Sequence, residues 1–412
     1  MLDHLRLSIP VLPIFIKKMG DTQIFNGDIR DYHLPAATRH VSRDLDGNTI
    51  TGDLYSPYES LPSSYTDMAM KFYTQSRHCP PYVEIKASPL KLLQGHNLYG
   101  FESIELGAVE MLGLLGDAYP QLVAILDFAN IEVLHLDTTY YTKLPHQSMV
   151  QPVLDYLSSC STGHRKAKKL AYENYITWGS DTARYLRPKA YGKFEEMKAQ
   201  MNKLQKSADR GCTRSKKLVM IMHENLPLAN AVVRFEGRVC KTYLTKNFIP
   251  GTKQPYPTNL WALIKLQKEN PKLLTDLWHV VFDPILNTLK GKNMCYADDA
   301  EILETLKDEL KTYTKSGNVS YTKAKNAFQF YNMLRQMGFS KVKDLYSETT
   351  FYRNLNALIS AGISKAALQN LHKSPEGKVI PVAQICHINF SNQLPSHYVM
   401  PTSRYMERLK VA

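Results

Sequence analysis

The sequence has no long apolar run. Its longest apolar stretches, such as residues 9–16, fall far short of the roughly 20 residues that cross a membrane. Asp3, His4 and Arg6 interrupt the start of the chain, which lacks the apolar region and small-residue cleavage site of a secretory signal. The six cysteines are scattered and form no C-x-x-C motif. We therefore expect no membrane partner, no disulfide framework and no cysteine zinc site, and a reducing cytoplasm as the location.

The sequence also lacks a G-x-x-x-x-G-K-[ST] loop and a strand-linked G-x-G-x-x-G motif, so nothing indicates nucleotide hydrolysis or dinucleotide binding. It does have 412 residues, of which 44% are hydrophobic and 22% are charged. These values are typical of a folded protein with about two or three domains.

Positive charge is concentrated in one segment. The net charge is +13, and residues 161–217 alone contain 15 Lys+Arg against 5 Asp+Glu, interleaved with aromatic residues. Because cations neutralise phosphates and aromatic rings stack on unpaired bases, this pattern favours nucleic-acid binding over a solvated charged surface. The cations expected to contact phosphates are Arg165, Lys166, Lys168, Lys169, Arg184, Arg187, Lys189, Arg234 and Arg238.

Hydrophobic periodicity predicts an α+β domain followed by helices. Strands are predicted over residues 5–9, 68–73, 82–88, 131–142, 172–178 and 231–243, and helices over 104–115, with Ser103 as its N-cap, 147–157 and 191–204. Further helices are predicted at 260–268, 272–289, 300–313, 323–337, 342–346 and 350–361. We expect an antiparallel sheet flanked by helices over residues 1–247, a helical connector over 248–293 and a mostly helical module over 294–412.

Three of the predicted strands carry ionisable side chains on one face. These side chains are Glu84 and Lys86, His135 and Asp137, and Arg234, Glu236 and Arg238. If the three strands share a sheet, this face is a functional site rather than part of the core.

His135 and Asp137 resemble a pair of metal ligands, because residues two apart on a strand lie side by side. With a carboxylate from a neighbouring strand, either Glu84 or Glu236, they would form a mixed nitrogen and oxygen site that suits Mg²⁺ or Mn²⁺. The alternative is a simple hydrogen-bonded His–Asp pair.

Tyr191 and Lys193 form a Y-x-K motif inside the basic segment. Tyrosine, with a pKa of about 10, is a weak nucleophile at neutral pH, but an adjacent ammonium lowers that pKa and neutralises charge on a phosphate. The motif alone has little weight, because the chain contains 25 tyrosines.

Longer blocks carry a family resemblance. They are Tyr-Val-Glu-Ile-Lys-Ala-Ser-Pro-Leu-Lys-Leu-Leu-Gln-Gly-His-Asn at 82–97, Pro-Tyr-Glu-Ser-Leu-Pro-Ser-Ser-Tyr at 57–65, Val-Val-Arg-Phe-Glu-Gly-Arg at 232–238, and the closing segment from Val379. Over essentially its whole length, the chain resembles the replication-initiator (gene II) family of filamentous bacteriophages. That resemblance implies an endonuclease that nicks the viral strand at the origin of the supercoiled replicative form. It also implies that the enzyme starts rolling-circle replication at the 3′-hydroxyl and recircularises the displaced single strand.

The same resemblance implies a tyrosine-nuclease-like fold and site. It places Tyr191 as the nucleophile that forms a phosphotyrosine intermediate, with Lys193 beside it. It also places His135 and Asp137 at a histidine-hydrophobic-histidine metal motif for Mg²⁺ or Mn²⁺, with Asp137 replacing the second histidine. Glu84 is the expected third ligand, ahead of Glu236 and His96. The implied partners are double-stranded origin DNA, the displaced viral strand, and the helicase and polymerase of the bacterial host cytoplasm.

A further implication concerns Met294, where the family starts a shorter product that binds DNA and inhibits replication. Residues 294–412 contain 15 Lys+Arg and 10 Asp+Glu, which suits DNA binding. Within them, residues 340–345 and 349–361 could form a helix-turn-helix that presents Tyr352, Arg353 and Asn356 to a DNA groove. The alternative is an ordinary helical pair.

Two other functions stay open for the whole chain. One is a non-catalytic regulator that only binds the origin, and the other is a metal-dependent nuclease that uses water, with Tyr191 stacking on a base. A covalent protein–DNA adduct is expected only from the nicking and joining enzyme.

The basic segment makes a first prediction. Replacing Arg165, Lys166, Lys168 and Lys169 with Gln should flatten the plot of log affinity for duplex DNA against log salt by up to about three to four units, since each neutralised phosphate contributes about −0.9. Anisotropy titrations of a labelled origin duplex at several salt concentrations measure this slope. An unchanged slope would mean that these cations lie on a solvated face.

Overall fold

The computed structural model describes the chain except residues 33, 35–38, 44–48, 54–57, 160–166, 170–173, 181, 288–298, 315–317, 364, 372–387 and 407–412. Arg165, Lys166 and Met294, which carry sequence predictions, lie outside the described residues.

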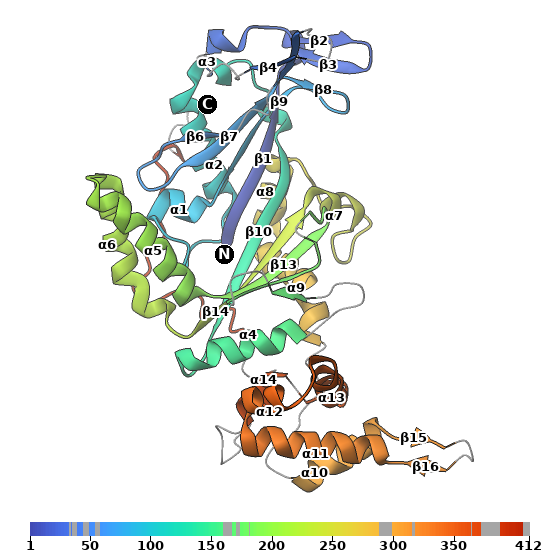
Figure 1. The fold of residues 1–412 in the computed structure, drawn as a ribbon. Coiled ribbons are helices and arrows are strands. Elements are labelled where there is room, and N and C mark those ends of the chain that lie inside the picture. Colours follow the sequence, from blue (N-terminus) through green and yellow to red (C-terminus); the bar gives the residue numbers. More distant parts are fainter. Residues whose placement is uncertain are drawn as a thin grey trace.

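A large antiparallel sheet organises the first part of the chain. Among the described residues, nine strands form this sheet in the order β11-β12-β13-β14-β10-β1-β9-β7-β6, and every printed strand pair is antiparallel (Figure 1). The strands are β1 (Leu2–Pro10), β6 (Glu59–Leu61), β7 (Met68–Tyr73), β9 (Tyr82–Ala87), β10 (Glu132–Lys143), β11 (Ala167–Lys169), β12 (Tyr175–Trp178), β13 (Leu186–Gly192) and β14 (Val232–Cys240). The predicted α+β fold with an antiparallel sheet is confirmed.

Helices cover one face of this sheet and form the main core with it. They are α2 (Ile104–Ala118), α4 (Val150–Ser159), α8 (Leu260–Glu269) and α9 (Leu273–Leu286), and α2 and α8 lie behind the strands in the view of Figure 1. Phe235 of β14 packs edge-on against Trp278 and Phe282 of α9, which bury the apolar side of the sheet. The predicted cap of α2 is confirmed, because the Ser103 hydroxyl accepts a hydrogen bond from the Leu106 N–H.

Smaller elements complete this part of the chain. Two short sheets join β2 (Ile16–Met19), β3 (Thr22–Phe25) and β8 (Gln75–Ser76), and β4 (Arg39–Arg43) with β5 (Thr49–Asp53). The remaining helices are α1 (Pro89–Gln94), α3 (Pro120–Val123), α5 (Lys193–Asp209), α6 (Thr213–Ala229) and α7 (Lys241–Lys246). Within the described part of the chain, none of the helices is both long enough and apolar enough to span a membrane.

The prediction of a helix from residue 191 is wrong at its start. Tyr191 belongs to β13, and α5 begins at Lys193. In this strand Tyr191 lies opposite Tyr175 on one side and Arg234 on the other, so pairing on both sides overrides the local helical spacing. Pro188 hid the strand, because proline is rare inside a sheet. The helix α6 was also not predicted from the sequence.

The C-terminal helices form a separate core. They are α10 (Asp299–Glu309), α11 (Thr322–Met337), α12 (Phe339–Leu345), α13 (Glu348–Ser360) and α14 (Lys365–Asn370), grouped at one end of the molecule in Figure 1. The helix predicted to reach residue 313 ends at Glu309, because β15 (Thr312–Tyr313) pairs with β16 (Val319–Ser320). The predicted pair of short helices around residue 346 is present as α12 and α13. On α13, Tyr352, Arg353 and Asn356 are exposed.

The last described segment, residues 388–406, packs on the sheet domain rather than on the C-terminal helices. Phe390 lies 4.9 Å from the ring of Tyr140 and 5.3 Å from that of Trp278. The Gln393 side chain accepts a hydrogen bond from the Tyr141 N–H and donates one to the Tyr141 carbonyl. The predicted division at residue 294 stays a prediction, but the core of the sheet domain includes residues from beyond it.

This packing makes a prediction about Gly113 of α2. A Cβ at position 113 would overlap the ring of Tyr405, whereas a Cβ at Gly116 on the same helix meets nothing within 4 Å. Gly113→Ala should therefore displace Tyr405 and lower the free energy of unfolding by about 1–3 kcal/mol, as overpacking does. Gly116→Ala should be neutral or stabilising by up to about 1 kcal/mol. Thermal melting and limited proteolysis of the C-terminal segment test both, and equal behaviour of the two variants would contradict the assignment.

Candidate active site

The three predicted ionisable faces meet on the side of the sheet opposite the helices, as predicted. We call this side the ionic face. It consists of His4 and Arg6 on β1, Glu84 and Lys86 on β9, His135 and Asp137 on β10, Arg187, Lys189 and Tyr191 on β13, and Arg234, Glu236 and Arg238 on β14. The contribution of β1, which lies between β9 and β10, was missed by the sequence reasoning, although the alternation of His4 and Arg6 with Leu5 and Leu7 could have revealed it.

Asp137 is locked in a bidentate ion pair at the centre of this face. Nε and Nη2 of Arg238 each lie 2.7 Å from one carboxylate oxygen of Asp137, which is 1% exposed. Burial alone would raise the pKa of Asp137, but the hydrogen bonds and charge of Arg238 hold that pKa well below its usual range. Asp137 is therefore a carboxylate at neutral pH.

His4 and His135 form a stacked pair beside Asp137. Their ring centroids are 5.2 Å apart, and Nε2 of His135 lies 3.2 Å from Nδ1 of His4. Burial lowers the pKa of both imidazoles, and the opposing charge of Asp137 does not compensate. Both rings are therefore neutral at neutral pH, which is the form that binds metals.

Glu84 is not brought to His135 and Asp137. It lies on β9, and β1 separates β9 from β10, so the backbones are about 10 Å apart. Its fully buried carboxylate accepts hydrogen bonds from Arg6 Nη2 at 2.6 Å and from the Tyr58 hydroxyl. Among the residues that the structure describes, no three His, Cys, Asp or Glu side chains are arranged to hold a metal. The ligand set predicted from the sequence therefore stays a prediction.

The two other predicted alternatives for the third ligand are also engaged elsewhere. The carboxylate of Glu236 accepts a hydrogen bond from Lys189 Nζ at 2.7 Å. His96 lies on the loop after α1, with its ring against that of Tyr99 and its Nδ1 near the Leu98 N–H.

Tyr191 lies at the end of the ionic face, where β13 turns into α5. Its ring stacks on Tyr175 at 5.9 Å, and both Lys193 Nζ and Arg234 Cζ lie 5.9 Å from its centre. The side chain is 7% exposed. Burial raises the pKa of Tyr191 well above its usual value, although the charge of Arg234 acts in the opposite direction. The phenol is therefore protonated at neutral pH and needs a proton acceptor to act as a nucleophile.

A β-bulge helps to position the cations around Tyr191. The register of β1 against β10 shifts between residues 2 and 4, which allows Asp3 to turn toward Arg234. Oδ1 of Asp3 lies 3.0 Å from Nη2 of Arg234 and accepts a hydrogen bond from Asn97 at 2.8 Å. Nevertheless, within the described part of the chain, the buried Nε and Nη2 atoms of Arg234 make no hydrogen bond. These donors are available to an oxygen of a bound phosphate.

Lys193 is nearly as buried as Arg234. Its Nζ donates to Asn97 Oδ1 at 2.9 Å and to Glu196 Oε2 at 2.6 Å. Burial lowers the pKa of Lys193 to about 8, against the opposing charge of Glu196. An amine with this pKa exchanges its proton near neutral pH, so Lys193 can act as an acid or a base beside Tyr191.

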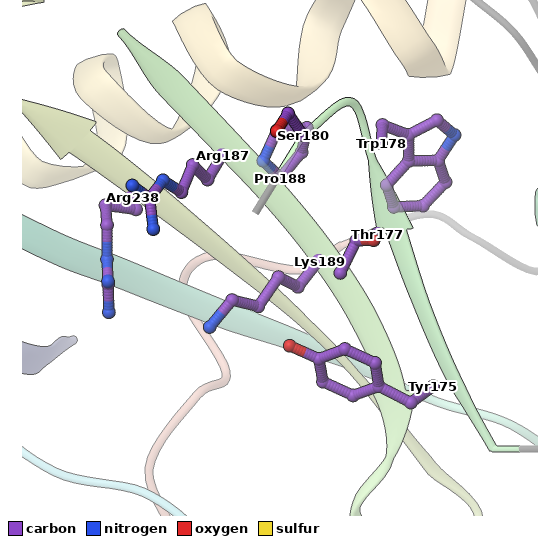
Figure 2. A pocket seen from close by; sticks show the side chains of 8 residues that line it. All are labelled: Tyr175, Thr177, Trp178, Ser180, Arg187, Pro188, Lys189 and Arg238. Atoms are coloured by element: carbon purple, nitrogen blue, oxygen red, sulfur yellow. The ribbon is translucent and has the colours of Figure 1, made fainter. Parts of the chain in front are cut away.

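A pocket of about 200 Å³ opens next to this site (Figure 2). Its lining residues are Tyr175, Thr177, Trp178, Ser180, Arg187, Pro188, Lys189 and Arg238. In Figure 2 the cationic ends of Arg187, Lys189 and Arg238 lie on one side of the pocket. The pocket therefore joins three of the predicted phosphate contacts to Tyr175, the stacking partner of Tyr191.

The other predicted phosphate contacts are dispersed. Arg184 is exposed in the loop before β13, and Arg234 is buried beside Tyr191. Lys168 and Lys169 lie in the edge strand β11, and the positions of their side chains are not described.

Comparison with known proteins assigns the class. The family of the N-terminal part of the phage gene II replication-associated protein matches residues 1–256, and the family of its C-terminal part matches residues 313–404. The replication-associated protein of this type in Salmonella phage IKe is 35% identical over 90% of this chain and 87% of its own length. Those of Enterobacteria phages fd and M13 are 31% identical over 89% of this chain and 88% of theirs. No solved structure matches the chain.

These similarities define a phage replication initiator. More specifically, the chain belongs to the gene II replication-associated protein family, as the resemblance in the sequence suggested.

The neutral histidine pair makes a prediction about pH. Above pH 7 both rings are neutral in the folded and unfolded states, whereas below about pH 6.5 only the unfolded chain takes up protons. The free energy of unfolding should therefore fall as the pH drops, by up to about 1.4 kcal/mol per histidine and pH unit. Urea denaturation at pH 7.5 and 5.5 should show a smaller loss for His135→Gln than for the wild type. The exposed control His223→Gln should behave like the wild type, and an undiminished loss in His135→Gln would refute the assignment.

Proposed function

We propose that the chain is a site-specific endonuclease that nicks the viral strand at the phage origin, starts rolling-circle replication and later rejoins the displaced strand. The observation that carries this proposal is the buried Tyr191 beside Arg234, whose unpartnered donors suit a phosphate oxygen. Origin duplex and the displaced single strand are the proposed substrates, and the host cytoplasm, with its helicase and polymerase, is the proposed setting.

In the proposed reaction, the Tyr191 hydroxyl oxygen attacks the scissile phosphorus and the bond from phosphorus to the 3′ oxygen breaks. The products are a free 3′-hydroxyl and a 5′-phosphotyrosine. The neutral fraction of Lys193, with its pKa of about 8, accepts the phenol proton, and the same residue as an ammonium protonates the leaving 3′ oxygen. Arg234 stabilises the negative charge that develops on the phosphate.

The covalent intermediate accounts for the joining activity. A phosphotyrosine retains the free energy of the phosphodiester bond, so attack by a 3′-hydroxyl reseals the strand without ATP. This economy agrees with a sequence that has no nucleotide-binding loop. The pocket lined by Arg187, Lys189 and Arg238 is the proposed seat of a phosphate next to the scissile one.

We propose that a divalent cation, Mg²⁺ or Mn²⁺, binds at His135 and Asp137, with His4 in place of Glu84. Two ligands of one ion are about 3 Å apart when their bonds are near 2.1 Å, and the facing nitrogens of His4 and His135 are 3.2 Å apart. Such an ion would act as a Lewis acid on a phosphate oxygen. Arg238 holds Asp137 ready as a carboxylate, whereas Glu84 is already neutralised by Arg6.

The C-terminal module is proposed as a second DNA-binding element and, translated separately from Met294, as an inhibitor of replication. The exposure of Tyr352, Arg353 and Asn356 on α13 supports groove binding. In such a fragment, Phe390 and Tyr405 would lack the sheet-domain partners that bury them.

Adduct formation tests the nicking function. Incubation of the full chain with supercoiled origin plasmid and Mg²⁺ or Mn²⁺, followed by denaturing gel electrophoresis, should trap a covalent protein–DNA species that is lost with chelator. Tyr191→Phe should bind the plasmid but give no adduct and no nick, because the nucleophilic oxygen is gone. The control Tyr185→Phe removes a nearby hydroxyl that hydrogen-bonds to Asn247, and this variant should keep both activities.

Other outcomes separate the rival functions. Nicking without an adduct would indicate hydrolysis by water, and origin binding without nicking would indicate a non-catalytic regulator. An adduct in Tyr191→Phe that disappears in Tyr185→Phe would move the nucleophile to Tyr185.

A further inference from the structure

A second group of tyrosines and cations lies on the ionic side of the sheet, far from Tyr191. Alternation along β7 and β9 places it there: Met68, Met70, Val83 and Ile85 enter the core, and the residues between them face the other way. Tyr58, just before β6, closes over the same area. We call Tyr58, Lys71, Tyr73, Tyr82 and Lys86 the tyrosine–lysine platform.

The rings and ammonium groups of the platform are layered. Tyr73 and Tyr82 are stacked with centroids 4.6 Å apart and an angle of 18° between their planes. Lys71 Nζ lies 4.8 Å from the centre of the Tyr73 ring, and Lys86 Nζ lies 3.2 Å from that of Tyr58. All three tyrosines are partly exposed. A core would use phenylalanine, so half-exposed tyrosines between cations favour a surface that binds a ligand.

The charge of this area is positive. The carboxylate of Glu84 is fully buried beneath Tyr58 and is neutralised by Arg6. Lys71 and Lys86 therefore outweigh the acid that lies among them. In addition, the buried Nε of Arg6 makes no hydrogen bond within the described part of the chain. An anion bound at the platform would supply the missing acceptor.

We propose that the tyrosine–lysine platform binds single-stranded DNA, with a base stacked on the Tyr73–Tyr82 pair and phosphates held by Lys71, Lys86 and Arg6. Single strands offer free base faces to aromatic rings, whereas the bases of a duplex are already stacked on one another. This inference rests on the proposed nicking function, which supplies a single strand, and it adds a site that neither the basic segment nor the C-terminal module contains.

The position of the platform sets the length of strand that it needs. From β13, which carries Tyr191, to β7, which carries Tyr73, the sheet order crosses five strand spacings, or about 24 Å. At about 3.4 Å per stacked nucleotide, this distance corresponds to roughly seven nucleotides. The strand joined to Tyr191 therefore reaches the platform only when it extends about that far from the cut.

Single-strand affinity tests the platform in the full-length chain. Anisotropy with a labelled oligo(dT) should show binding weakened by about 10-fold or more in Tyr82→Ala, in line with the loss of one stacked base. Tyr82→Phe keeps the ring and should stay within about 2-fold of the wild type. Phe248→Ala removes an exposed aromatic elsewhere in the same part of the chain and serves as the control. Equal affinity of Tyr82→Ala and the wild type would overturn the platform.

Two further measurements keep the result unambiguous. A bromouracil oligonucleotide should crosslink to Tyr82 or Tyr73 in the wild-type protein, so the site can be mapped even if Tyr82→Ala is unstable. An absence of crosslinks there would refute the proposal. If Tyr82→Ala weakened duplex binding as much as single-strand binding, the single-strand assignment would also fail.

The failure of this proposal can be distinguished from failure of the nicking function. A short origin oligonucleotide that ends fewer than about five nucleotides from the cut should form the Tyr191 adduct equally well in the wild type and Tyr82→Ala, whereas a longer one should favour the wild type. Adducts that are equal at both lengths would overturn the platform alone. An absence of adduct in the wild type at either length, with oligo(dT) binding still dependent on Tyr82, would overturn the nicking function alone.

Discussion

The buried pairing of Arg234 with Asp3 is the interaction on which the Tyr191 end of the site depends. A guanidinium that is 1% exposed has to be compensated, and the nearby charge comes from the first strand of the chain through a β-bulge. Asn97 links the same carboxylate to Lys193. The strand that opens the chain and the helix that follows β13 are thus held by one polar network, and Tyr191 lies between its cations.

The same sheet serves two opposite purposes. On one face, aromatic and aliphatic side chains pack under α2, α4, α8 and α9, and this burial supplies most of the stabilisation. On the other face, charges are buried in pairs, which is costly unless each has a partner. The C-terminal segment reinforces the apolar side, where Phe390 and Tyr405 enter the core near α9 and α2. The two ends of the chain therefore both contribute to the domain that carries the site.

Burial also sets the protonation states that the proposed chemistry uses. It keeps His4 and His135 neutral and Tyr191 protonated, and it lowers the pKa of Lys193 toward neutrality. Arg238 has the opposite effect on Asp137, which stays ionised although it is buried. A carboxylate, two neutral imidazoles and an amine with a pKa of about 8 thus lie along one face, and this is a combination that exposed side chains would not show.

Local features of the sequence determined much of the fold. Alternation predicted β7, β9, β10 and β14 and the direction of their ionisable side chains, and a serine before an apolar run predicted the start of α2. Only the tertiary structure decided which strands are neighbours. The insertion of β1 between β9 and β10 brings His4 to His135 and separates Glu84 from it, and pairing on both sides draws Tyr191 into a strand. Periodicity reports the face to which a side chain points, but the order of strands depends on contacts between residues more than a hundred positions apart, which no local pattern encodes.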